Sequence, residues 1–402
     1  MTTQSLTTQH SYLIEPLAPL VFRSGKPFGP QSGADMPLFP MPSSLAGLLR
    51  TVLADQQYKG QSLNDLSDQL RQTSVRGPLL ARYRDPVSPK LFVTKPADAI
   101  YVDDDGVTKV IRLLPKALDA DCGSDLPSNL LPVQMKEKLK GKPKSGPQYW
   151  AMDNFIAWQN ENEQAVNFEE LKKNGLESLP NEQRTHVAIS NETFASDDGK
   201  LFQTSGLDFS APRKLAEKDQ AEKTEYNGWC DERLGLWAQS DAQLSNDLVT
   251  FGGERRLSQL IELPKSSDLT QTNTKLAAQI REKKGVKLTL LTPAIFVNGY
   301  LPAWLDKTSL EGVIPHSDGL RVKLKACAIE RWQAVSGFDL KEWKPKVMRK
   351  AVAAGAVYWF EVIGNVPDNI HKSLWFANIS DDPQDQRDGF GLVLPAAWQV
   401  TT

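Results

Sequence analysis

Short strand-like segments separated by glycine- and proline-containing turns restrict the fold of this chain more than any other feature. Such segments include residues 12–22 (YLIEPLAPLVF), 286–296 (VKLTLLTPAIF) and 355–364 (GAVYWFEVIG). One stretch differs, because its apolar residues repeat at the i, i+3, i+4 spacing of a helix, beginning at Ser43 or Ser44, both good N-cap residues. A strand at 12–22, a helix after it and many later strands predict an α+β fold.

The length of 402 residues is typical of two or three domains. No apolar run approaches the roughly 18 residues of a membrane span, and the N-terminal residues lack the pattern of a secretory signal. Cys122, Cys230 and Cys327 are too widely spaced for a zinc site or a disulfide framework. We therefore expect a cytoplasmic protein with no membrane partner.

The chain offers little for catalysis. It has four histidines, and it contains no HExxH, paired CxxC, GxSxG or phosphate-loop motif, so we expect no metal and no cofactor. The acidic run at 103–105 precedes Gly106 and fits a solvated turn better than an ion site. His186 lies near Arg184 in a predicted hairpin, residues 184–209, with its turn at Ser-Asp-Asp-Gly. That histidine has three open roles: a general base for RNA cleavage, an RNA contact, or a structural residue.

Four loops combine glycine with cations: FRSGKPFG (22–29), FGGERR (251–256), KPKVMRKAVAAG (344–355) and RDGFG (387–391). Glycine lets backbone N–H groups approach a phosphate, and arginine or lysine neutralises its charge. Phe28 and Phe390 would each provide a face for base stacking. The net charge of −2 gives no sign of nucleic acid, although cations clustered on one face still bind RNA. Ordinary turns with surface charges remain the alternative.

A lysine at every second position marks the segment Lys136–Lys144. In an extended chain these side chains would project from one face. A solvated loop and a cationic finger that contacts a phosphate backbone are both consistent with this pattern.

The order of the segments resembles the RAMP superfamily of CRISPR proteins. EPLAPLVFRSGKPFG is followed by PSSLAGLLR, and then by GPLL, KPADAI, RTHVAISNETFASDDGKLF, FGGERRL, LLTPAIFVNGYLP, SGFDLKEWKPKVMRKAVAAGAVYWFE and GFGLVL. More narrowly, the set is similar to the Cas5-like subunit that caps the crRNA 5′ end in the type III-B (Cmr) effector complex. The likeness runs from about residue 12 to 398. The terminal loop is only GFG, which is shorter than in many RAMP proteins.

This resemblance implies two ferredoxin-like (RRM-related) domains with inserted β-hairpins. The domains would span residues 10–210, with insertions over about 75–180, and residues 211–402. It also implies a non-catalytic role in antiviral defence. The chain would grip the repeat-derived 5′ handle of the crRNA and bridge the large polymerase-type subunit to the backbone RAMP subunit, contacting target RNA only indirectly. A metal-independent endoribonuclease and a scaffold without RNA contact are the alternatives.

The resemblance assigns roles to individual residues. The FRSGKPFG loop and the helix start at Ser43 and Ser44 would form a phosphate cradle. Arg50 would either reach the same anion or be solvated. The expected phosphate ligands are Arg23, Lys26, Arg255, Arg256, Lys346, Arg349 and Lys350. Close backbone approach is expected at Gly252, Gly253, Gly389 and Gly391, for which plain turns are the alternative. Base contacts are expected from Phe28, Arg184 and His186, with Phe28 alternatively anchoring its loop.

Overall fold

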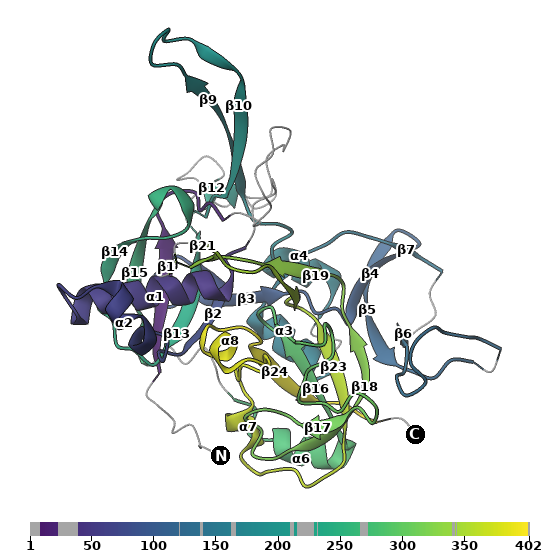
Figure 1. The fold of residues 1–402 in the computed structure, drawn as a ribbon. Coiled ribbons are helices and arrows are strands. Elements are labelled where there is room, and N and C mark those ends of the chain that lie inside the picture. Colours follow the sequence, from purple (N-terminus) through teal and green to yellow (C-terminus); the bar gives the residue numbers. More distant parts are fainter. Residues whose placement is uncertain are drawn as a thin grey trace.

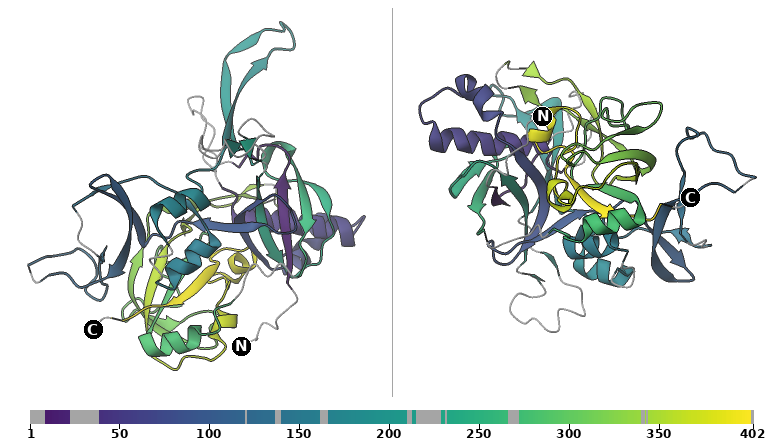
Figure 2. Two further views of the ribbon diagram at one scale, coloured as in Figure 1. Left: turned by 180° about the vertical axis from the view of Figure 1, so that it is seen from behind. Right: turned by 90° about the horizontal axis from the view of Figure 1, so that it is seen from below.

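The computed structural model describes most of the chain (Figures 1 and 2). The described residues are 9–22, 39–119, 121–136, 140–161, 166–209, 213–214, 229–230, 232–265, 272–339, 342 and 344–400. They form a mixed α/β structure in which antiparallel strand pairs dominate and helices are few. The predicted mixture of helices and strands is confirmed at this level.

The N-terminal half contains a seven-stranded sheet in the order β14-β15-β1-β13-β2-β3-β8. Its strands are β1 (His10–Pro16), β2 (Val75–Tyr83), β3 (Lys90–Thr94), β8 (Tyr149–Ala151), β13 (Arg233–Ser240), β14 (Asp247–Thr250) and β15 (Leu257–Glu262). β1 lies between β13 and β15, and it is antiparallel to both. The predicted domain boundary at 210/211 therefore cuts across this sheet.

Helix α1 (Pro42–Gln57) packs against the sheet through Leu45, Leu49 and Val52 and is followed by α2 (Leu63–Leu70). The N-cap of α1 is Met41, and its side chain makes no capping hydrogen bond. The predicted serine cap is wrong, because Ser43 and Ser44 lie inside the first turn. Pro42 explains the earlier start, since its fixed φ and missing N–H suit the first helical position.

The C-terminal half contains a five-stranded sheet in the order β17-β18-β23-β16-β24. Its strands are β16 (Gly285–Leu290), β17 (Glu311–Val313), β18 (Arg321–Ala328), β23 (Val357–Val362) and β24 (Val393–Ala397). Three short helices accompany it, α6 (Leu276–Lys283), α7 (Ile370–Ser373) and α8 (Pro383–Arg387).

The two sheets share a hydrophobic core. Leu13 and Trp237 of the first sheet pack in one buried cluster with Phe376 and Leu394 of the C-terminal half. The rings of Trp237 and Phe376 meet edge to face, with centroids 5.9 Å apart. Both halves therefore depend on the same buried side chains.

A buried ionic cluster forms a second link. Asp98 precedes β4 (Ala99–Asp104) and is fully buried. Its Oδ2 lies 2.9 Å from Nζ of Lys287 on β16 and 3.7 Å from Nη1 of Arg112 on β5 (Val107–Pro115). The Trp158 indole donates to Oδ1 of Asp98 at 2.8 Å, and the Arg112 guanidinium lies 3.7 Å from the Trp158 ring. Burial lowers the pKa of Lys287 through loss of solvation. One carboxylate therefore faces two buried cations.

Several smaller units extend from the sheets. A four-stranded sheet lies at one side, made of β4 (Ala99–Asp104), β5 (Val107–Pro115), β6 (Val133–Met135) and β7 (Lys142–Pro143). Helices α3 (Met152–Gln159) and α4 (Phe168–Asn174) follow it, and β11 (Arg213–Lys214) pairs with β12 (Trp229–Cys230).

A long β-hairpin, β9 (Asn181–Ile189) with β10 (Ser196–Leu207), projects from the body in Figure 1 and in the left view of Figure 2. This hairpin was predicted from the sequence. Its tip, however, lies at residues 190–195, and the predicted Ser-Asp-Asp-Gly turn begins β10 instead.

A second hairpin, which we call the 332–352 arm, lies in the C-terminal half. It pairs β19 (Trp332–Val335) with β22 (Arg349–Val352) and, nearer its tip, β20 (Phe338–Asp339) with β21 (Lys344–Pro345).

Candidate functional site

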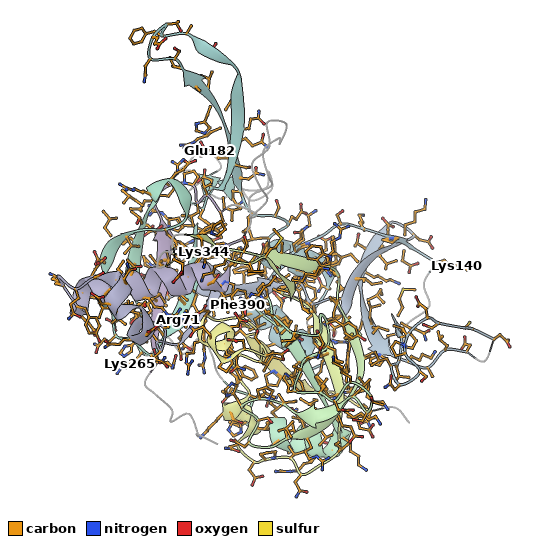
Figure 3. All side chains as sticks on the ribbon, in the orientation of Figure 1. Arg71, Lys140, Glu182, Lys265, Lys344 and Phe390 are labelled. Carbon is orange, nitrogen blue, oxygen red and sulfur yellow. The ribbon has the colours of Figure 1, made fainter. Side chains whose placement is uncertain are left out.

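Three of the segments singled out in the sequence meet at one end of the seven-stranded sheet. The Gly253 N–H donates to the Val21 carbonyl at 2.8 Å, which ties the FGGERR turn to the residues that lead into FRSGKPFG. Leu20 and Leu207 exchange two backbone hydrogen bonds of 2.8 Å, which ties the same residues to the base of the β9–β10 hairpin. We call this junction the hairpin-base site; Figure 3 labels Glu182 within it.

Packing explains the first glycine of the FGGERR turn. Gly252 has a φ of +80°, and a Cβ at this position would lie 2.9 Å from the Val21 carbonyl oxygen. The neighbouring rings of Phe22 and Phe251 meet edge to face at 5.1 Å. Gly252 is therefore required by local geometry, whether or not a ligand approaches.

Most charges at the hairpin-base site are paired. Arg184 forms two hydrogen bonds to Glu182, at 2.8 and 3.0 Å, which hold the pKa of Glu182 below its usual range. Arg256 forms an ion pair with Glu254. Arg255 is exposed and, within the described part of the chain, has no carboxylate partner. It is the cation of this turn that is available to an anionic ligand.

The hairpin itself carries exposed apolar side chains that the sequence reading did not single out. Val187 and Ile189 on β9 are exposed, and Phe194 at the tip is 83% exposed. His186 points across the hairpin, with Nε2 2.8 Å from Thr204 Oγ1. Exposure alternates along β9, and the available signal was the prediction of an isolated hairpin, because two strands alone have no core in which to bury either face.

A second junction joins the start of α1, the RDGFG turn and the inner face of the 332–352 arm. Phe390 is fully buried and packs with Met41, Val335 and Ala351. The suggestion that Phe390 offers a face for base stacking is therefore wrong, because core side chains cover its ring. Figure 3 labels Phe390 in the interior of the molecule.

The glycines of this turn are also fixed by packing. Gly389 has a φ of +97°, and an added Cβ would lie 2.8 Å from the Gly77 carbonyl oxygen. Gly391 has a φ of +78°, and its Cβ would lie 2.7 Å from the Ser380 nitrogen. Both residues are buried, so the conformation of the turn is sufficient to explain the two glycines.

The cations of the arm differ in their surroundings. Arg349 binds Asp385 of α8 through two hydrogen bonds of 2.7 Å. The ammonium of Lys350 lies 5.2 Å from the centroid of the Trp332 ring. Lys346 is exposed, and its backbone N–H donates to Gly337.

Arg50 is paired within the protein and does not lie in solvent. Its side chain is 12% exposed, and it donates to Asp388 Oδ1 at 2.6 Å and to the Thr73 carbonyl at 2.8 Å. It fastens α1 to the loop after α8, so both expectations for this residue are replaced by a structural role.

Arg23, Lys26 and Phe28 lie outside the described residues. By chain connectivity, residues 23–38 join Phe22 at the hairpin-base site to Phe39, two residues before Met41 at the second junction. The sequence therefore links the two junctions through the loop that carries these three side chains.

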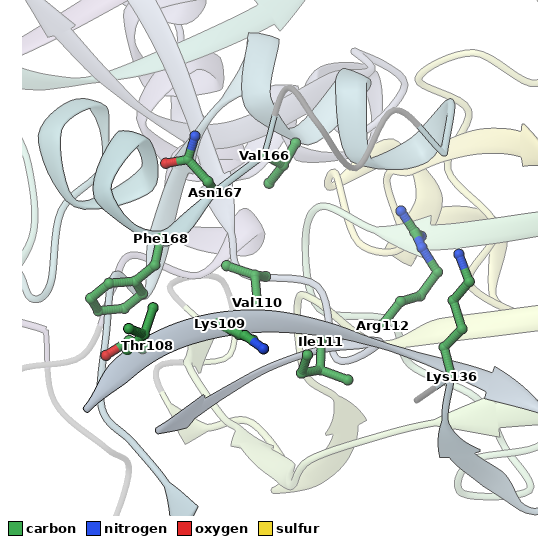
Figure 4. Close-up of a pocket in the computed structure, with 10 residues that line it drawn as sticks. Thr108, Lys109, Val110, Ile111, Arg112, Lys136, Val166, Asn167 and Phe168 are labelled. Carbon is green, nitrogen blue, oxygen red and sulfur yellow. The ribbon is translucent and has the colours of Figure 1, made fainter. Parts of the chain in front are cut away.

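The lysine-rich segment is partly a strand edge. Lys142 lies in β7, and Nζ of Lys144 lies 3.1 Å from Asp103 Oδ2. Lys136 lines a hollow of about 410 Å³ between β5 and α4, together with Lys109, Arg112 and Phe168 (Figure 4). Lys138 is outside the described residues. The solvated loop and the cationic finger that contacts a phosphate backbone both remain predictions for this segment.

The described residues contain neither a metal-binding cluster nor a membrane-spanning helix. No group of three or more His, Cys, Asp or Glu side chains is placed to hold a metal ion. No helix in the described part of the chain is long and apolar enough to cross a membrane.

Comparisons with known proteins connect the chain to one family. The family model described as CRISPR-associated protein (Cas_Cmr3) matches residues 12–398. Among curated protein sequences, none matches. The match to the family model confirms the resemblance seen in the sequence to a subunit of the Cmr complex.

Three solved structures are similar in outline. One is from the type III-B Cmr-beta complex bound to cognate target RNA and AMPPnP (17% identity, 87% of this chain, 86% of that chain, TM-score 0.43). Another is from Cmr-beta bound to cognate target RNA (16%, 87%, 86%, 0.44). A third is from the Csm3–Csm4 subcomplex of a type III-A interference complex (8%, 89%, 95%, 0.35).

Proposed function

The chain belongs to the Cas_Cmr3 family of CRISPR-associated proteins, and from this premise we propose that, within a type III-B (Cmr) effector complex, it holds the repeat-derived 5′ handle of the crRNA without cutting it. The observation that carries the proposal is the hairpin-base site. There, the FGGERR turn, the residues leading into FRSGKPFG and the foot of the β9–β10 hairpin are joined by backbone hydrogen bonds. The site presents the exposed Arg255 near the foot of a hairpin with exposed apolar side chains, and single-stranded RNA is bound by cations together with side chains that contact its bases.

We also propose that each half is a ferredoxin-like domain. In the first sheet the four strands β15, β1, β13 and β2 lie side by side in that order, so the fourth in the chain is followed by the first, the third and the second. In the second sheet β24, β16, β23 and β18 lie side by side with the same relation to their order in the chain. This order supports a βαββαβ ancestry for both sheets. The proposed division moves from 210/211 to the segment after Leu263, because β13, β14 and β15 belong to the first sheet.

The proposed partners are the crRNA handle, the large polymerase-type subunit and the backbone RAMP subunit, with target RNA contacted through the complex and the cytoplasm as the location. The exposed apolar side chains of the hairpin, Val187, Ile189 and Phe194, suit a protein or RNA neighbour better than water. Incubation of the pure chain with repeat RNA in the absence of metal tests the non-catalytic role. Product bands that disappear in His186→Ala would overturn it.

We expect Arg255→Ala to weaken binding of handle RNA severalfold. Because the side chain would neutralise one phosphate, the slope of log K against log salt should become shallower by about 0.7 for a single strand. Fluorescence anisotropy with labelled repeat-derived RNA at several salt concentrations measures both quantities.

The matched control for this experiment is Arg321→Ala, which removes an exposed arginine at the start of β18 in the other half. It should leave the slope unchanged. A slope that stays at the wild-type value in Arg255→Ala would remove this residue from the site. Arg256→Ala is less informative, because it also breaks the ion pair with Glu254.

A further inference from the structure

The outer face of the 332–352 arm carries an exposed tryptophan beside a lysine. Trp332 is 58% exposed, and the ammonium of Lys350 lies 5.2 Å from its ring centroid. Trp332 pairs with Val352 and Ala334 pairs with Lys350, so the tryptophan and the lysine project from the same face of the two strands. An aromatic surface and a positive charge are thus presented together to solvent.

The opposite face of the arm is fixed to the body. Val335 and Ala351 are buried against Phe390, and Arg349 binds Asp385 through two hydrogen bonds of 2.7 Å. Because the inner face is held by packing and by a bidentate ion pair, the outer face is presented in one orientation. A preorganised surface loses less conformational entropy when a ligand binds.

The charges around Trp332 favour an anionic ligand. Arg331 next to it in the chain, Lys350 over its ring and Lys346 nearer the tip of the arm are exposed and have no carboxylate partner among the described residues. The two nearby glutamates that are described are each engaged, Glu330 with Lys95 at 2.9 Å and Glu342 with Lys344 at 3.5 Å. Unpaired cations next to a ring match the chemistry of a nucleotide, which has a flat base and a negative phosphate.

From these observations we propose that Trp332 stacks on a base of single-stranded RNA while Lys350 and Lys346 contact its phosphates. The inference rests on the proposed RNA-binding function and adds a contact surface on the C-terminal half. Sequence reasoning assigned both lysines to phosphates but did not recognise Trp332. The exposed side chains of Val347 and Met348 elsewhere on the arm make a protein-docking face the competing interpretation.

The test uses the full chain and single-stranded oligoadenylate that contains 2-aminopurine. Stacking on an aromatic side chain is worth about 1–3 kcal/mol per base, so Trp332→Ala should weaken binding by about 5- to 150-fold and remove part of the 2-aminopurine quenching. Trp332→Phe should retain most of the affinity, and Lys350→Met should make the salt dependence shallower. Tyr300→Ala removes another exposed aromatic side chain in the same half and should change neither quantity.

The outcomes separate this inference from the proposed function. If Arg255→Ala weakens RNA binding and Trp332→Ala does not, the inference is wrong and the hairpin-base site stands. If Trp332→Ala leaves RNA affinity unchanged but prevents assembly with the other subunits, the arm is a protein interface, which also overturns the inference. If the wild-type chain binds no RNA, both proposals fail. Thermal unfolding of Trp332→Ala should match the wild type, since the side chain is mostly exposed.

Discussion

Replacing Asp98 with alanine will lower the free energy of unfolding by about 3–5 kcal/mol, because it removes the carboxylate that pairs with the buried ammonium of Lys287. Lys287 and Arg112 are each 4% exposed and share this one carboxylate, which also accepts from the Trp158 indole. Urea unfolding followed by circular dichroism measures the loss. Asp98→Asn keeps the shape of the side chain and should still be strongly destabilising.

The pH dependence of this loss identifies its cause. The pKa of Lys287 is already lowered, chiefly by burial, and Asp98 is the main group opposing that shift. Without Asp98 the pKa falls further, so alkaline solution neutralises Lys287 in the folded state before it does so in the unfolded chain. Asp98→Ala should therefore be more destabilising at pH 6 than at pH 9.

The control for this prediction is Asp103→Ala, which removes a more exposed carboxylate on the neighbouring strand β4 and should change stability far less. Equal effects of Asp98→Ala and Asp103→Ala, or no dependence on pH, would contradict the role of the buried cluster.

Phe390→Ala will cost about 3–5 kcal/mol, as expected for deleting a fully buried aromatic side chain. The cavity would open between Met41 at the start of α1 and Val335 and Ala351 of the arm. The variant should therefore also loosen the arm, which hydrogen exchange of the β19–β22 amides would detect as faster opening.

Phe390→Leu fills most of the same space and should cost less, so the two variants together measure packing at this point. A loss below about 1 kcal/mol in Phe390→Ala would mean that the second junction collapses around the missing ring, and it would contradict the fixed position of the arm.

Local sequence patterns predicted those helices and strands whose formation depends on local geometry. The helix at 42–57 follows from its apolar spacing, and the β9–β10 hairpin from two strand-like runs joined by a turn sequence. Errors arose at the ends of elements. Met41 rather than a serine caps α1, because Pro42 occupies the first helical position, and the hairpin turns at 190–195 instead of at the glycine that follows.

The candidate site was harder to predict, because burial depends on contacts that are distant in the sequence. Arg50 and Phe390 belong to motifs with the composition of anion-binding loops. In the structure, however, Arg50 is paired with Asp388, and Phe390 is covered by Met41. Conversely, Trp332 sits in a strand pattern that gives no sign of exposure. The meeting of FGGERR with Val21 could be expected only from the family resemblance, since more than 200 residues separate them.

The shared core between the two sheets has a mechanical consequence. Because Trp237 of one half and Phe376 of the other pack in the same buried cluster, we expect the two halves to move together as one body. Molecules bound at its two ends are held at a set separation. Among the described residues, the bridge between Leu20 and Leu207 fastens the β9–β10 hairpin at its foot, and we expect its projecting end to adjust to its neighbours.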